Sequence, residues 1–465
     1  VALRAISFIL LPFFTTVLNP LVAGEVFIFF TFLAFMNAFF AFGMDSALLK
    51  FYNKHDNTFS TSIISVFFFA LPCSLILFFY HESLSLFLFS KNSWYIVLFG
   101  ANLKWIIFLI IILSVDAFSS RCMTLLRSLE QPIYYLSVCL INVVLTLVLT
   151  VYFVKNIPDV SFRLDGVIKA TCFVACIQFA VLLPVLLRNL CKPLFNFTLF
   201  KKMFKVAWPF FPATIFFIII ELSDRILIDY YYGLAMVGLY GASAKIGALI
   251  LMLVRAFNLN WQPYYLKQGK KYSDNLKQVI PLFSNIGTMF IFFLITIIVL
   301  FTALWPSFIH LIIGEEFQKG GIVIPIIALA YGFFGIFILQ MPSIFLKNKH
   351  NWAPWIWGGG ALINIIGNLI LIPLLGPDYG YVGAAIATLL AYATMAIVLT
   401  YLNESWLKIN YNNKLINYAL CCSAVFLMCL IFASPVALWV NIFVSLIYSF
   451  AMLALFIISK DNILK

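Results

Sequence analysis

About fourteen apolar stretches, each close to the length that crosses a lipid bilayer, follow one another along this chain of 465 residues. A helix needs roughly 20 apolar residues to span the hydrocarbon layer, so this many spans leave room only for short connections. The stretches are continuously apolar and do not alternate with period two, which favours helices over a membrane barrel. Hydrophobic residues make up 64% and charged residues 10% of the chain, which excludes a water-soluble fold. We therefore predict an all-α integral membrane protein.

An even number of spans places both termini on the same side of the membrane. The loops on that side hold nineteen Lys and Arg residues, and the opposite loops hold four. Because cytoplasmic loops carry the positive excess, both termini are expected in the cytoplasm. The predicted spans cover residues 1–18, 25–47, 61–80, 95–119, 133–154, 166–188, 206–230, 238–260, 279–304, 322–345, 353–375, 382–402, 416–434 and 437–459.

This topology explains the net charge of +12, so no nucleic-acid partner is expected. The basic segments Lys201–Lys205 and Lys270–Lys271 are expected to contact anionic lipid head groups. The nine cysteines lie in spans or on the cytoplasmic side and are interpreted as small apolar residues without disulfides. The four histidines are far apart and lack ligand spacing, so neither a metal site nor a cofactor is predicted. Because Arg4 already lies in an apolar run, we expect further residues before Val1 and no cleavable signal peptide.

Three short hairpin tips occur twice along the chain. Gly24 aligns with Gly238, Ser90 with Gly314, and Gly166 with Gly383, at offsets of 214, 224 and 217 residues. The near-equal offsets predict an internal duplication of six spans, and an even number of spans gives both copies the same orientation. We expect two parallel six-helix lobes around a central cavity, with two additional C-terminal helices. The corresponding segments are 1–190, a basic linker at 191–205, 206–402 and 403–465.

Charged residues inside spans are the candidates for function, because they cost free energy in a bilayer and usually face a bundle interior. Glu221 and Arg225 are four residues apart and can pair on one helical face, and Asp224 can meet Lys245 across a tight turn. Such pairs can be structural or coupled to an ion, whereas unpaired cations suit an anionic substrate such as a phosphate. The candidate cations are Arg4, Lys50, Lys104, Arg225, Lys245 and Arg255, and the candidate acids are Asp45, Asp116, Glu221 and Asp224. These residues predict a cavity lined mainly by the first, second, seventh and eighth spans, with help from the fourth.

Five segments of the chain form a recognisable set of motifs: Arg4-Ala-Ile-Ser-Phe-Ile-Leu-Leu-Pro12, Phe42-Gly-Met-Asp-Ser-Ala-Leu-Leu-Lys-Phe-Tyr52, Leu222-Ser-Asp-Arg-Ile-Leu-Ile228, Val237-Gly-Leu-Tyr-Gly-Ala-Ser-Ala-Lys245 and Asn258-Leu-Asn-Trp-Gln-Pro-Tyr-Tyr265. This set resembles the polysaccharide-biosynthesis flippases of the MOP (multidrug/oligosaccharidyl-lipid/polysaccharide) superfamily, in particular those for O-antigen or capsule units. The resemblance implies a bacterial inner-membrane flippase that moves an undecaprenyl-diphosphate-linked oligosaccharide from the cytoplasmic to the periplasmic leaflet by alternating access. It also implies that Arg4, Lys50 and Arg255 contact the substrate, although Lys50 stands where relatives often have arginine. A coupling ion, H⁺ or Na⁺, and other polysaccharide assembly proteins are possible partners.

Three other functions remain open at this point. A multidrug exporter of the same superfamily would need unpaired acids for cationic substrates, whereas the unpaired buried charges here are mainly basic. A flippase for the peptidoglycan precursor is distinguished from an oligosaccharide flippase only by the resemblance described above. An integral-membrane polymerase, ligase or glycosyltransferase would need a large periplasmic or acid-rich loop, and the longest such loop, Trp305 to Gly321, offers only His310, Glu315 and Glu316.

Overall fold

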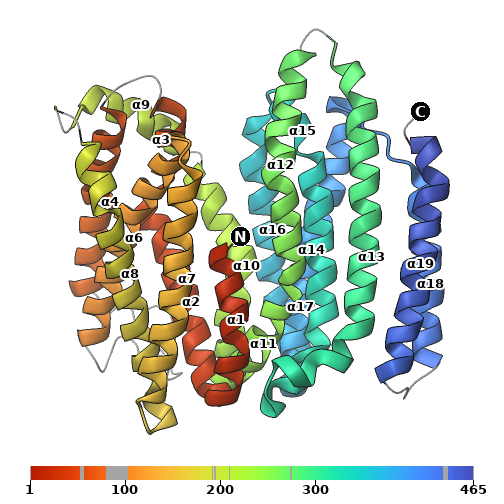
Figure 1. The fold of residues 1–465 in the computed structure, drawn as a ribbon, viewed down its shortest axis with the longest axis horizontal. Coiled ribbons are helices and arrows are strands. Elements are labelled where there is room, and N and C mark those ends of the chain that lie inside the picture. Colours follow the sequence, from red (N-terminus) through yellow and green to blue (C-terminus); the bar gives the residue numbers. More distant parts are fainter. Residues whose placement is uncertain are drawn as a thin grey trace. The chain divides into compact units, whose positions relative to one another are not determined.

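A computed structural model describes residues 2–52, 57–79, 103–190, 192, 195–208, 210–272, 275–432 and 438–463. All regular elements in this part of the chain are helices and none is a strand, which confirms the all-α prediction (Figure 1). Among the described residues, nine helices are long and apolar enough to cross a membrane, or eleven if each of two bent helix pairs is one span. The protein is therefore a multi-pass membrane protein.

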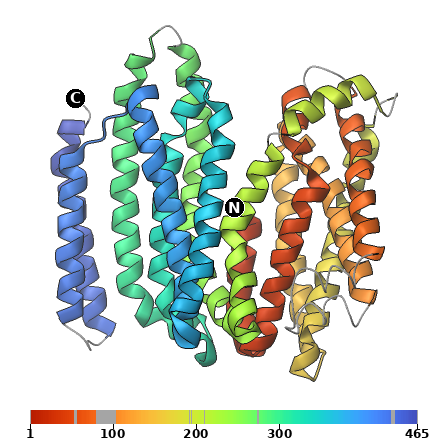
Figure 2. The same ribbon diagram turned by 180° about the vertical axis from the view of Figure 1, so that it is seen from behind.

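Two compact units form the chain, and they divide after Gly241. The unit of residues 2–241 consists of helices that run mostly the length of the unit (Figures 1 and 2). Its helices are α1 (Ala2–Val17), α2 (Pro20–Ala41), α3 (Met44–Phe51), α4 (Thr58–Phe79), α6 (Leu103–Ser128), α7 (Pro132–Lys155), α8 (Arg163–Arg188), α9 (Phe197–Ala207) and α10 (Phe210–Tyr232), with a 3₁₀ turn η3 (Val160–Phe162).

Helix α11 (Leu234–Gly247) contains the boundary between the units, and the remaining helices belong to the unit of residues 242–465. The predicted division at a linker of residues 191–205 stays a prediction. The remaining helices are α12 (Leu249–Lys271), α13 (Ile280–Ile312), α14 (Val323–Gln340), α15 (Pro342–Leu346), α16 (Ala353–Leu374), α17 (Gly376–Trp406), α18 (Asn413–Phe432) and α19 (Leu438–Ile463), with 3₁₀ turns η4 (Leu276–Val279), η5 (Glu315–Ile322) and η6 (His350–Trp352).

The predicted span at 25–47 is broken into two helices. Helix α2 ends at Ala41, because Phe42 and Gly43 both adopt left-handed backbone conformations with φ of 47° and 67°. Glycine adopts this conformation without a side-chain clash, whereas for Phe42 the conformation costs free energy. The Phe42 ring is held by stacking on Phe69 and Phe211, each at 4.4 Å between ring centroids. The chain then starts the short helix α3.

The predicted span at 238–260 is also interrupted. Helices α11 and α12 meet at Ala248 with a bend of 41°. Gly247 lies against Ile327 of α14, where a β-carbon would come within 2.8 Å of the Ile327 side chain. The predicted loop at Trp305–Gly321 is mostly helical as well, because α13 continues to Ile312 and η5 begins at Glu315.

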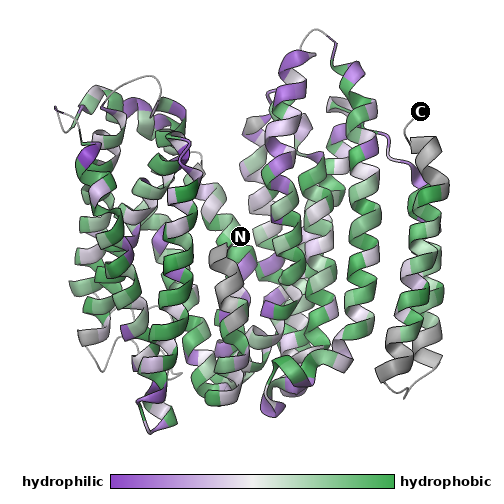
Figure 3. Cartoon of the chain, viewed as in Figure 1, coloured by the Kyte–Doolittle hydropathy of each residue, from purple (hydrophilic) through white to green (hydrophobic). Residues whose placement is uncertain are grey.

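Small residues allow the helices of the second unit to pack closely. Gly383 of α17 lies against the backbone of Leu371 in α16, and Gly367 of α16 lies against Ala387. Close approach through small residues is the usual way in which membrane helices associate, since burial away from lipid supplies little driving force. Hydrophobic residues cover most of the helix lengths, and hydrophilic residues gather mainly at helix ends and connections (Figure 3).

Candidate functional site

An ion pair between Asp45 and Arg121 lies at the break between α2 and α3. Asp45 is in the first turn of α3, and Arg121 reaches it from α6. The Asp45 carboxylate also accepts hydrogen bonds from the hydroxyls of Ser120 at 2.8 Å and Thr124 at 3.3 Å. The Arg121 side chain is fully buried. The guanidinium group of Arg121 has lost water and needs these partners, whereas 27% of the Asp45 side chain stays accessible.

Arg121 also completes the end of α2. Its Nη2 donates to the carbonyl oxygen of Ala41, the last residue of α2, at 2.6 Å. The last carbonyls of a helix lack intrahelical partners and carry partial negative charge, whereas the first turn carries partial positive charge. The cation therefore sits at the C-terminus of α2 and the anion at the N-terminus of α3, so both helix dipoles favour the pair. Asp45 and Arg121 together therefore connect the ends of α2 and α3 to α6.

Sequence reasoning missed Arg121 as a site residue. The predicted fourth span ended at residue 119, which placed Arg121 in a cytoplasmic loop, and this prediction is wrong because α6 continues to Ser128. The acid Asp45 inside a predicted span, 76 residues away, was the available signal that a cation must be near. Lys50, a predicted substrate contact, lies in the last turn of the same helix α3 and is exposed.

Asp116 of α6 forms a second contact with α2. Asn37 of α2 forms a side-chain hydrogen bond with the Asp116 carboxyl group. Together with the bond from Arg121 to Ala41, this contact places two polar connections between α2 and α6. Buried polar groups in a membrane require such partners.

The charged residues of α10 lie in two arrangements. Asp224 is buried and accepts a hydrogen bond from the Tyr240 hydroxyl of α11. Arg225 donates to the backbone carbonyl of Glu221 at 3.5 Å, one turn earlier on the same helix. The structure thus identifies Tyr240 as a partner that the sequence analysis did not name, while the pairing of Asp224 with Lys245 stays a prediction.

Helices α2 and α11 approach each other so closely that only glycine fits at two positions. A β-carbon on Gly24 would overlap the carbonyl oxygen of Leu234, and one on Gly238 would overlap the carbonyl oxygen of Pro20. Glu25, next to Gly24, is buried, as is Asp229 near the end of α10. Glu25 was not among the predicted site residues, although a lone acid near the start of an apolar span was visible in the sequence.

The remaining predicted cations occupy other helices. Lys245 in α11 and Arg255 in α12 are half-buried. Arg4 and Lys104 belong to α1 and α6, but their side chains lie outside the described part of the structure. No group of three or more His, Cys, Asp or Glu side chains among the described residues is placed to hold a metal ion.

The polar and charged groups described above share two features. Carboxylates, guanidinium groups and hydroxyls lie inside long apolar helices, where an unneeded charge would be costly. Several of these groups are fixed in pairs at helix ends and helix contacts, so they shape the bundle.

Three solved structures are similar to this chain. The lipid II flippase MurJ in an inward closed conformation has 16% identity and a TM-score of 0.75, covering 99% of this chain and 98% of that chain. A Vibrio cholerae MATE transporter, VcmN, has 14% identity and a TM-score of 0.61, covering 87% and 94%. The MATE transporter ClbM in complex with Rb⁺ has 14% identity and a TM-score of 0.56, covering 90% and 92%. At these identities the likeness concerns the fold.

No curated protein sequence matches this chain. The model of a family described as polysaccharide biosynthesis protein matches residues 1–268, which is more than half of the chain and includes the helices that carry most of the candidate residues. The chain therefore belongs to the polysaccharide biosynthesis protein family, and it has the helical transporter fold seen in MurJ and the MATE transporters.

Proposed function

We propose that the protein is a flippase that moves a polyprenyl-diphosphate-linked oligosaccharide from the cytoplasmic to the periplasmic leaflet by alternating access. The observation that carries this proposal is the concentration of charged side chains within α3, α6, α10, α11 and α12 of a membrane protein from a polysaccharide biosynthesis family. A diphosphate and several sugars cannot cross hydrocarbon unaided, because the unpaired polar groups would cost many kcal/mol. The lipid tail can stay in the bilayer throughout.

Basic side chains are the proposed contacts of the diphosphate. They are Arg4, Lys50, Lys104, Arg225, Lys245 and Arg255. Arginine at these positions can hold two phosphate oxygens at once, whereas lysine acts as a single charge. The acids Asp45, Asp116, Glu221 and Asp224 are the proposed residues for ion coupling or structural pairs, and the contacts of Asp45 with Arg121 and of Asp116 with Asn37 support a structural role for those two.

The membrane potential can supply driving force. Each negative charge that moves outward gains about 2.3 kcal/mol per 100 mV of inside-negative potential. A gradient of H⁺ or Na⁺ is the alternative source of energy. We further propose a cytoplasmic location of both termini in a bacterial inner membrane, contact of the basic segments with anionic lipids, and cooperation with other polysaccharide assembly proteins.

A second function is favoured by the buried acids. Glu25, Asp224 and Asp229 are all nearly inaccessible within the unit of residues 2–241. Buried carboxylates suit a cationic substrate or a coupled cation, and the fold is shared with MATE transporters. Cation export is therefore the competing proposal, and export of a lipid-linked peptidoglycan precursor is a variant of the first one.

Proteoliposomes that contain the purified protein and a fluorescent polyprenyl-diphosphate oligosaccharide provide the test. Accessibility of the label to an external quencher is followed with and without an imposed potential. Protein-dependent exchange between leaflets, lost in Arg4→Ala and in Arg255→Ala at unchanged protein level, supports the proposal. Absence of exchange by a folded protein that instead exports a fluorescent cation would assign the competing function.

A further inference from the structure

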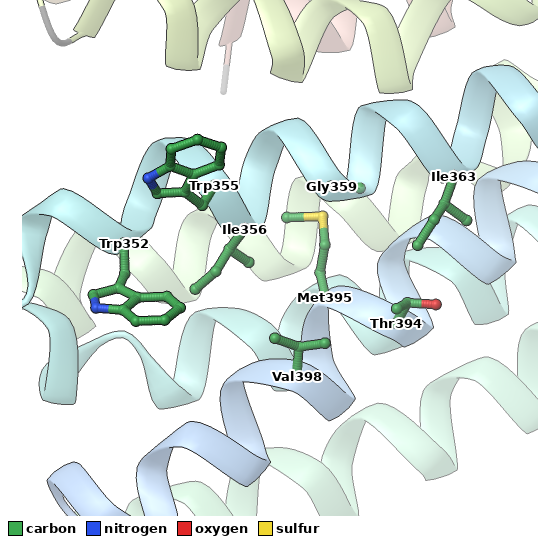
Figure 4. Close-up of a pocket in the computed structure, with 9 residues that line it drawn as sticks. Trp352, Trp355, Ile356, Gly359, Ile363, Thr394, Met395 and Val398 are labelled. Atoms are coloured by element: carbon green, nitrogen blue, oxygen red, sulfur yellow. The ribbon is translucent and has the colours of Figure 1, made fainter.

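A narrow apolar groove runs between α16 and α17 in the second unit. Its volume is about 200 Å³. Trp352 and Trp355 lie at one end, and Met395 of α17 extends between the two helices toward Gly359 (Figure 4). Gly359 has open space where a β-carbon would be, so the missing side chain helps to form the groove.

The lining offers almost nothing polar to a ligand. Thr394 carries the one hydroxyl among the lining residues, all of which the structure describes, and this hydroxyl donates to the carbonyl oxygen of Leu390 at 2.7 Å. A sugar or another polar molecule would lose its hydrogen bonds to water in such a groove. A hydrocarbon chain would lose none.

Positive charge lies at the end of the groove that the tryptophans mark. Lys349 places its Nζ 5.7 Å from the centre of the Trp406 ring, and Trp406 packs edge-on against Trp352 at 5.6 Å between centroids. The backbone N–H of Trp352 donates to the carbonyl oxygen of Lys349 at 3.0 Å, which ties the basic turn to the groove. Lys347, two residues earlier, is exposed.

We propose that this groove is a specific binding site for one acyl chain of an anionic glycerophospholipid, with the lipid phosphate at Lys349. Tryptophan and lysine together are typical of the depth at which head groups meet the hydrocarbon layer. The small volume suits part of a single chain, and the open side lets the rest of the lipid lie in the bilayer. This site is independent of the proposed transport activity.

Quenching of tryptophan fluorescence by brominated lipids tests the site. The full-length protein is reconstituted in vesicles with increasing fractions of brominated phosphatidylglycerol or brominated phosphatidylcholine. The signal of Trp355, 78% exposed, is obtained as the difference between the wild-type protein and Trp355→Phe. We expect half-quenching at a lower mole fraction of the anionic lipid than of the zwitterionic lipid.

Two variants remove the two parts of the site. Gly359→Leu places a side chain where a β-carbon meets open space, so it should obstruct the groove and abolish the preference for the anionic lipid. Lys349→Gln should reduce the preference about fivefold, the change that corresponds to about 1 kcal/mol for one lysine near the surface. Leu369→Phe on α16 outside the groove and Lys408→Gln in the loop after α17 should leave the preference unchanged.

Three results would overturn the proposal. Equal quenching by both lipids, or a preference that both Gly359→Leu and Lys349→Gln retain, would mean that the groove makes only ordinary contacts with lipid. Half-quenching by a brominated polyprenyl phosphate at a lower fraction than by phosphatidylglycerol would assign the groove to a polyprenyl tail. Size-exclusion profiles of the variants establish that each one folds.

Discussion

Gly24 of α2 and Gly238 of α11 make reciprocal contacts. Each glycine is packed against the backbone carbonyl oxygen of the residue four positions before the other, Leu234 and Pro20. Since 238 − 24 and 234 − 20 both equal 214, exchanging the two helices maps this pair of contacts onto itself. Phe27 and Gly241 are in contact and are also 214 residues apart. Exchanging the two helices therefore maps this contact onto itself as well.

Replacing either glycine by alanine should separate α2 from α11. The added methyl group meets backbone, which cannot rotate away as a side chain can, so each variant is expected to lose about 1–3 kcal/mol of stability. The lower midpoint of thermal unfolding in detergent would show this loss. Gly359→Ala is the matched control, because its β-carbon has open space and alanine favours a helix. An unchanged midpoint for both Gly24→Ala and Gly238→Ala would contradict the close packing.

The reciprocal contact supports the alignment of Gly24 with Gly238 that the sequence predicts. The alignment of Gly24 with Gly238 came from short tip sequences, and the same pair lies at an approximate two-fold contact in the structure. The extent of the duplication stays a prediction. Continuous apolar runs predicted the helices well, because hydrocarbon requires internal backbone partners. The break at Phe42 and Gly43 was not predictable, because it depends on ring stacking with Phe69 and Phe211 from other helices.

Removing the charge of Asp45 should destabilise the protein strongly. In Asp45→Asn the guanidinium group of Arg121 stays buried without its counter-charge, and breaking a buried pair in this way costs about 3–5 kcal/mol. Thermal unfolding in detergent measures the effect. The double variant Asp45→Asn with Arg121→Met should recover much of the loss, since no buried charge is then left alone.

The pair of Lys169 and Asp165 is the control for that experiment, because its cation is 41% exposed whereas Arg121 is fully buried. Its charged atoms are 2.6 Å apart, and both side chains are partly exposed. Solvent-exposed pairs contribute about 0–1 kcal/mol, so Lys169→Gln should change the unfolding midpoint little. If Asp45→Asn were as mild as Lys169→Gln, the structural role of the buried pair would be wrong.

Prediction of the site was limited because the sequence does not show which residues pair with the charged residues inside spans. Positions of charged residues inside apolar runs identified Asp45, Asp116 and Asp224 as buried polar groups, and the structure places each beside a hydrogen-bonding partner. The partners themselves, Arg121 and Tyr240, were not identified. An arginine near a span end is also what the charge bias of loops predicts, so its sequence position alone cannot separate a buried ion pair from a cytoplasmic charge.

Loss of the Tyr240 hydroxyl should weaken the contact between α10 and α11. Both Tyr240 and Asp224 are 2% exposed, and a hydrogen bond to a charged group contributes about 1.5–3 kcal/mol. Tyr240→Phe is therefore expected to lower the unfolding midpoint, whereas Tyr230→Phe, which alters an exposed ring of α10, should not. Equal midpoints for the two variants would show that the hydroxyl contributes nothing to stability.

Helix α9 should bind anionic lipid through its outward face. Leu199, Met203 and Ala207 are buried against α3, which turns the remaining face outward. That face carries exposed Lys201, Lys202 and Lys205, with exposed Phe197 and Trp208 beside them. Basic residues at a membrane surface contribute about 1 kcal/mol each toward anionic lipid, and aromatic side chains insert at the interface.

Changing the three lysines to glutamine should reduce the enrichment of phosphatidylglycerol around the protein and its dependence on salt. Lipid that copurifies with the protein in mild detergent, counted by mass spectrometry at low and high ionic strength, measures both quantities. The control is Lys155→Gln at the end of α7, an exposed charge that the loop bias places on the opposite side of the membrane. Because three exposed charges are removed, the loss should be largest at low salt and small above about 0.5 M, where the Debye length is only a few ångströms. Retention of the same salt-dependent enrichment by the triple variant would mean that α9 faces solvent, and the basic linker would then have no part in lipid binding.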